Sequence, residues 1–83
     1  MTKYKIKLNT FDKVQSFVKN MLNVEFDSII RSEDRKYAVD AKSIMGLYSL
    51  DLAKDLILEI NGEVEDLIDK LASANICVTV IND

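Results

Sequence analysis

The chain has 83 residues, of which 48% are apolar and 30% are charged, and its formal net charge is −3. This length and composition predict one folded domain over residues 1–83 and exclude an intrinsically disordered chain. The acidic balance argues against nucleic-acid binding, and no apolar run approaches the roughly 18 residues that a membrane span needs. Because histidine is absent, imidazole catalysis, phosphohistidine chemistry and imidazole metal ligation are excluded, and we expect neither a metal nor a cofactor.

The single cysteine and the N-terminal segment predict a cellular compartment. Cys77 has no second cysteine with which to form an internal disulfide, which agrees with a reducing environment. The first residues lead into alternation between lysine and apolar residues, not into the continuous apolar core of a signal peptide. We therefore expect a cytoplasmic protein in which Cys77 is a small apolar residue in or near the core.

The first strand and the first helix follow from hydrophobic periodicity. Tyr4, Ile6 and Leu8 alternate with lysines, which predicts a half-buried strand whose charged face is solvated. Asn9 or Thr10 can cap the helix that follows, because both side chains accept hydrogen bonds from free amides. The apolar residues at helical spacing in this first long helix are Phe11, Val14, Phe17, Val18, Met21 and Leu22.

A hairpin is predicted next, formed by a strand that includes Phe26, Ile29 and Ile30 and a strand over residues 37–41. The charged segment 32–36 between them has the composition of a turn. Ser43 then precedes the apolar residues of a short helix and can cap its first turn. Gly46 either relaxes this helix or allows a close backbone approach.

The last third of the chain predicts a strand, a helix and a further strand. In residues 56–60, Leu56, Leu58 and Ile60 alternate with Ile57 and Glu59, and the segment ends at Asn61-Gly62, a turn signal. Apolar residues between 64 and 71 recur at helical spacing, with acidic residues in the first turn where the helix dipole favours them. The β-branched segment 76–81 can add an edge strand, parallel to strand 56–60 through the helical crossover.

These elements predict an α+β protein with an open-faced, two-layer sandwich. We expect a mostly antiparallel four-stranded sheet, with an extra C-terminal edge strand if residues 76–81 join it. Two long helices and one short helix should cover one face of the sheet.

The segment Lys42-Ser43-Ile44-Met45-Gly46, continued by Leu47-Tyr48-Ser49-Leu50, resembles the HPr family of phosphocarrier proteins of the bacterial sugar phosphotransferase system. In that family this serine caps a short helix, and in many Gram-positive members a dedicated kinase phosphorylates it. The element order and length from about residue 4 to about residue 72 are also similar. The resemblance therefore implies an HPr-like fold for most of the chain.

The chain departs from this family at the phosphate-accepting histidine. HPr proteins carry that histidine at the start of the first long helix, in a Gly-Ile-His-Ala-Arg-Pro type motif where free amides, the helix dipole and an arginine stabilise the phosphoryl group. Counting back from Ser43 without gaps places Asp12 opposite the histidine and Val14 opposite the arginine. Neither role carries over, so we expect a protein that is not an enzyme and has no catalytic residue.

The resemblance then implies a regulator or adaptor in carbon-source control that acts by binding proteins. Its expected partners are HPr kinase, a transcriptional regulator or a metabolic enzyme, and the protein itself is expected to be a monomer or a weak dimer. Ser43 is the candidate for regulatory phosphorylation, and Ile44, Met45 and Gly46 are the candidates for the partner-binding surface.

Several alternatives stay open. Ser43 as an ordinary N-cap would explain that serine fully, and Ile44 and Met45 could be core residues under the short helix. The protein could be a phosphocarrier that forms an acyl phosphate on Asp12, although such sites usually assemble further carboxylates around magnesium. It could also be a diverged interaction module of the same fold with an unrelated role.

Overall fold

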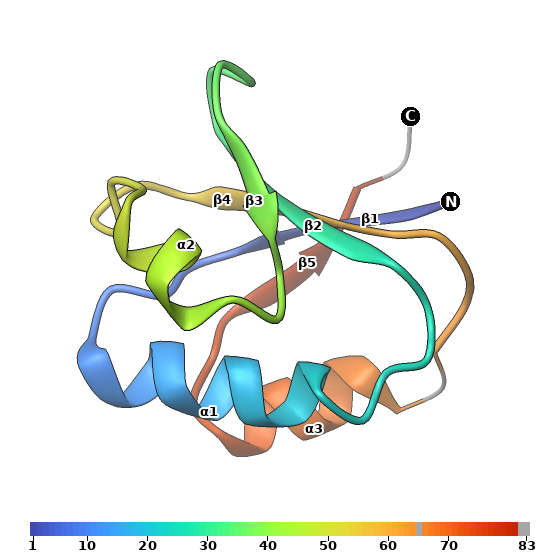
Figure 1. The fold of residues 1–83 in the computed structure, drawn as a ribbon. Helices are drawn as coiled ribbons and strands as arrows, with labels where there is room; N and C mark the ends of the chain where they lie inside the picture. Colours follow the sequence, from blue (N-terminus) through green and yellow to red (C-terminus); the bar gives the residue numbers. More distant parts are fainter. Residues whose placement is uncertain (65, 82–83) are drawn as a thin grey trace.

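Five strands and three helices form the structure, a computed structural model that describes residues 1–64 and 66–81 (Figure 1). The strands are β1 (Thr2–Ile6), β2 (Ser28–Ser32), β3 (Ala38–Asp40), β4 (Leu56–Ile60) and β5 (Val78–Val80). The helices are α1 (Phe11–Met21), α2 (Ile44–Tyr48) and α3 (Leu67–Ser73). Within the described residues no helix is long and apolar enough to cross a membrane.

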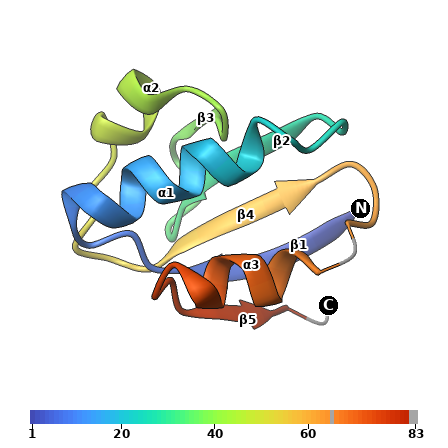
Figure 2. The ribbon, with the colours of Figure 1, turned by 90° about the horizontal axis from the view of Figure 1, so that it is seen from below.

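The strands form one sheet in the order β3-β2-β4-β1-β5, and all neighbours are antiparallel. The helices lie on one face of this sheet, with α1 and α3 side by side beneath it (Figures 1 and 2). The predicted α+β class and the β2–β3 hairpin are therefore confirmed. β5 does occupy an edge, but it pairs with β1, so β1 separates it from β4.

The finer expectation of a four-stranded sheet under two long helices differs from the structure. The sheet has five strands, and of the three helices only α1, with 11 residues, is long, since α2 has five and α3 has seven. α3 begins at Leu67, and Asp66 before it adopts a left-handed conformation (φ 62°) and makes no side-chain capping hydrogen bond. Val64 therefore precedes the helix, and the predicted first-turn residue Glu65 lies outside the described residues.

A single core lies between the sheet and the helices. Its fully buried large side chains come from every strand except β3 and β5 and from all three helices, together with Leu8 and Ile76 of the connecting segments. Thr10 caps α1 by accepting a hydrogen bond from the Lys13 amide, 3.2 Å away, as predicted for one of two candidate residues.

Several apolar residues that the periodicity placed inward are exposed. Phe11 is the first residue of α1 and Leu22 follows its last, and at 3.6 residues per turn both are rotated roughly 60–80° from Val14, away from the buried face of the helix. Phe26 and Tyr37 lie just outside β2 and β3 and are also exposed. Cys77, expected in or near the core, is exposed as well, whereas its neighbour Ile76 is buried in the core.

β4 is buried along its whole length, including Ile57 and Glu59, whose side chains alternate with those of the core. The cause is its central place, because β1 and β2 flank it on both sides. Arg31 lies on β2, opposite Ile57 of β4, and its Nε donates to the Glu59 carboxylate at 2.9 Å. The Arg31 side chain is partly exposed, whereas only 10% of the Glu59 side chain is exposed.

We expect Arg31→Ala to lower the free energy of unfolding by about 1–3 kcal/mol, because it leaves the buried Glu59 carboxylate without its charged partner. Urea unfolding of the variant measures this change. The double variant Arg31→Ala/Glu59→Gln removes the unpaired charge and should be more stable than Arg31→Ala alone. Equal stability of the single and double variants would show that the ion pair does not carry the effect.

Candidate functional site

Ser43 caps α2 with its side chain. The residue is extended (φ −101°, ψ 107°), and its Oγ accepts a hydrogen bond from the Gly46 amide at 3.1 Å, while its carbonyl accepts from Leu47 at 3.0 Å. This is the arrangement that the sequence predicted for a serine before a short apolar helix. The side chain is half-buried.

The turn before α2 fixes the position of Ser43. The Asp40 carboxylate accepts from the Lys42 amide at 2.9 Å, and the Asp40 carbonyl accepts from the Ser43 amide at 3.0 Å. The Lys42 ammonium donates to the carbonyl of Val24, just beyond α1, at 2.7 Å. These bonds tie the start of α2 both to the end of β3 and to the segment after α1.

The first turn of α2 retains free donors. A helix leaves its first amides without intrahelical partners, and here the Ser43 side chain satisfies that of Gly46. Among the described residues, nothing accepts from the amides of Ile44 and Met45. These amides point toward the N-terminal end of α2, where the helix dipole favours negative charge.

Of the three predicted partner-binding residues, only Met45 is freely accessible. Its side chain is 77% exposed, so the alternative that Met45 is a core residue is wrong. Ile44 is partly buried and packs against the core, which agrees with the alternative that Ile44 is a core residue under the short helix. Gly46 lies where a Cβ would come within 3.1 Å of the Val39 Cβ, so the absence of a side chain allows α2 to approach β3 closely.

Two aromatic residues that the sequence reasoning missed lie near Met45 in the fold. The rings of Phe11 and Tyr48 stack with centroids 5.9 Å apart and an interplanar angle of 13°. Both residues are exposed, Phe11 by 60%, and Tyr48 lies one helical turn after Met45. We call Phe11, Met45 and Tyr48 the apolar α2 surface. The sequence did contain one sign of this surface, a large apolar residue, Phe11, at the very start of α1. Helical spacing alone grouped it with the inward-facing residues.

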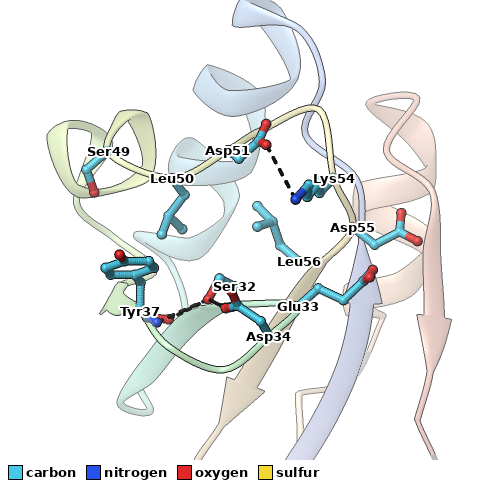
Figure 3. A pocket seen from close by; sticks show the side chains of 10 residues that line it. All are labelled: Ser32, Glu33, Asp34, Tyr37, Ser49, Leu50, Asp51, Lys54, Asp55 and Leu56. Atoms are coloured by element: carbon cyan, nitrogen blue, oxygen red, sulfur yellow. Dashed lines mark hydrogen bonds and ion pairs between the residues drawn. The ribbon is translucent and has the colours of Figure 1, made fainter.

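A cleft of about 420 Å³ lies on the other side of α2, between the β2–β3 turn and the segment after α2 (Figure 3). Buried Leu50 and Leu56 supply its apolar part, and Tyr37 lines it from the hairpin. Its charged lining consists of four carboxylates and one ammonium group, from Glu33, Asp34, Asp51, Asp55 and Lys54. This excess of negative charge disfavours phosphorylated ligands.

The carboxylate of Asp34 is held in the turn between β2 and β3. It accepts from the Ser32 hydroxyl at 2.6 Å and from the Lys36 amide at 3.0 Å. The Ser32 hydrogen bond and then the Lys36 amide lower the pKa of Asp34 below its ordinary value. The carboxylate therefore stays ionised over a wider pH range and adds to the negative charge of the cleft.

Asp12, the alternative phosphate acceptor, is exposed in the first turn of α1. Across residues 1–64 and 66–81, no three histidine, cysteine or acidic side chains gather in a way that could hold a metal ion. The described residues thus do not surround Asp12 with the carboxylates that a magnesium-assisted acyl phosphate site would use.

Replacing Ser43 by alanine should lower the free energy of unfolding by about 1 kcal/mol, because the Gly46 amide loses its acceptor. Ser43→Asn, which retains a capping oxygen, is the matched control and should stay close to the wild type. Chemical denaturation of the three proteins measures the difference, and equal losses in both variants would contradict a capping role.

The candidate site at α2 is therefore identified by the geometry around Ser43 and by the resemblance of residues 42–50 to the HPr family. Comparisons of the chain with protein-family models, with curated proteins and with solved structures find no match.

Proposed function

We propose that this chain is an HPr-like protein that lacks phosphocarrier activity and regulates carbon-source use in the cytoplasm by binding other proteins. The observation that carries the proposal is the exposed Met45 side chain close to Ser43, the residue that caps the start of α2. A residue that is modified in the resembled family thus lies beside an apolar surface suited to protein contact.

The order of elements supports the HPr-like interpretation. Strand, helix, strand, strand, short helix, strand and helix follow one another from β1 to α3, as the resemblance implies. The sheet, with helices on one face only, agrees with an open-faced sandwich. β5 would then be an addition particular to this chain.

The chemistry at Ser43 supports a phosphorylation switch. A phosphate on Oγ would replace the present cap and could accept hydrogen bonds from the free amides of Ile44 and Met45 as well as Gly46. It would also bring nearly two negative charges next to the apolar α2 surface. Partners that need an uncharged apolar contact would be released, and partners with a basic pocket would be favoured.

The partners on this proposal are proteins: HPr kinase as the modifying enzyme, and a transcriptional regulator or a metabolic enzyme as the target. On this proposal the partner contacts the side chains of the apolar α2 surface directly, and no cofactor takes part in the contact.

Incubation with HPr kinase and ATP should add one phosphate to the protein, seen as a single shift in intact mass and mapped to Ser43 by fragmentation. Ser43→Ala should not be labelled. An unmodified mass after complete labelling of an ordinary HPr in the same reaction would argue for a diverged module in which Ser43 is a cap only.

We expect Met45→Asp to lower the kcat/KM of this phosphorylation about tenfold or more, because it places a charge in the apolar contact that the kinase must cover. Stability should change by less than about 0.5 kcal/mol, since Met45 is exposed. Leu22→Asp, at an exposed apolar residue after α1, is the matched control and should be phosphorylated normally. Equal effects of the two substitutions would contradict a docking role for the apolar α2 surface.

A further inference from the structure

β5 is a free edge of the sheet. It pairs with β1 on one side, and within the described residues no strand lies on its other side. Exposed strand edges present unpaired amides and carbonyls that can pair with another strand.

The hydrogen bonds to β1 show which groups of β5 face outward. The Ile81 amide donates to the Lys3 carbonyl at 3.0 Å, and Thr79 lies opposite Lys5. Because hydrogen-bonded and non-hydrogen-bonded pairs alternate in an antiparallel ladder, residues 79 and 81 direct their backbone groups toward β1. The amides and carbonyls of Val78 and Val80 therefore point to the open edge.

The two edges of the sheet differ in charge. β3, at the opposite edge, contains Asp40 and follows the charged turn 33–36, and such charges discourage edge-to-edge pairing. Residues 76–81 contain neither a charge nor a proline. Nothing in the sequence of β5 repels a second copy of the same strand.

We infer that two copies of this chain associate through antiparallel pairing of β5 with β5, around a two-fold axis at Thr79. In this register Val78 of each copy lies opposite Val80 of the other, and each such pair exchanges two hydrogen bonds. The symmetry makes the edge complementary to itself. The association would join the two sheets into one continuous sheet.

The side chains fit this register. Val78 and Val80 lie opposite Ile6 and Tyr4 of the core, so their side chains are on the face that the helices cover, where Val80 is exposed. Pairing would bring these valines together across the axis on that face. Thr79, beside Lys5, would meet its symmetry mate on the open face, and threonine pairs are favourable across antiparallel strands.

The dimer should be weak. A three-residue edge covers far less than the roughly 1,200 Å² at the lower end of stable interfaces. We therefore expect a monomer–dimer equilibrium that shifts with protein concentration, which sedimentation equilibrium detects.

The register is tested by a cysteine at the axis. Thr79→Cys in a Cys77→Ser background should form an intermolecular disulfide under mild oxidation, because residues in a non-hydrogen-bonded pair lie about 4.5 Å apart between Cα atoms, within disulfide range. The native Cys77 is the matched control. It lies two residues from the axis, so the two copies are separated by roughly 13 Å along the strands and should not be joined.

A second variant tests the edge without relying on a disulfide. Val80→Pro removes an outward amide but no bond to β1, and proline is tolerated on an edge strand in that position. It should raise the dimer dissociation constant about tenfold or more, since it deletes two symmetry-related hydrogen bonds. Ala38→Pro removes an outward amide from β3 and should leave the constant unchanged, while circular dichroism checks that each variant is folded.

Sedimentation as a monomer at every concentration, together with no Thr79→Cys disulfide, would overturn the dimer. The open edge of β5 would then be available only to a strand of another protein. Equally rapid cross-linking through Cys77 would overturn the register. Because none of these measurements involves Ser43 or the kinase, their outcome is independent of the proposed function.

Discussion

The pairing of β4 with both β1 and β2 is the constraint on which the rest of the structure depends. β4 joins the N-terminal strand β1 to the β2–β3 hairpin, and its two neighbours are far from it in the sequence. All five residues of β4 are buried, although the helices cover only one face of the sheet. Its one charged residue, Glu59, must therefore be compensated, and the neighbouring strand provides Arg31 for this purpose.

The same arrangement determines where α2 lies. The chain must cross from the edge strand β3 back to the central β4, and α2 is part of that crossing. The crossing brings α2 next to the start of α1, where Tyr48 stacks on Phe11. With only five residues, α2 buries Leu47 fully and leaves Met45 outside. An apolar surface next to the capping residue Ser43 thus follows from the topology and the shortness of this helix.

The candidate site was predictable where it depends on local interactions. Ser43 caps α2 because the acceptor and the Gly46 amide are three residues apart, a relation that the sequence contains in full. The exposure of Phe11 was not predicted, because the apolar spacing of α1 includes Phe11, whereas only Val14, Phe17 and Met21 are buried and the Phe11 ring stacks on Tyr48 of a different helix. The acidic cleft was not predictable either, since it joins the β2–β3 turn to the segment after α2.

The sequence by itself determined the α+β class, the hairpin, the Ser43 cap and the inward residues of β1, and it narrowed the cap of α1 to Asn9 or Thr10, because these depend on periodicity and on neighbours a few residues away. Tertiary structure alone decided the place of β5 beside β1 and the burial of Glu59, because both depend on pairing between strands that are distant in the sequence. At Ser43 the sequence supplied the cap, whereas the packing of α2 against β3 and α1 decided which neighbouring side chains face outward.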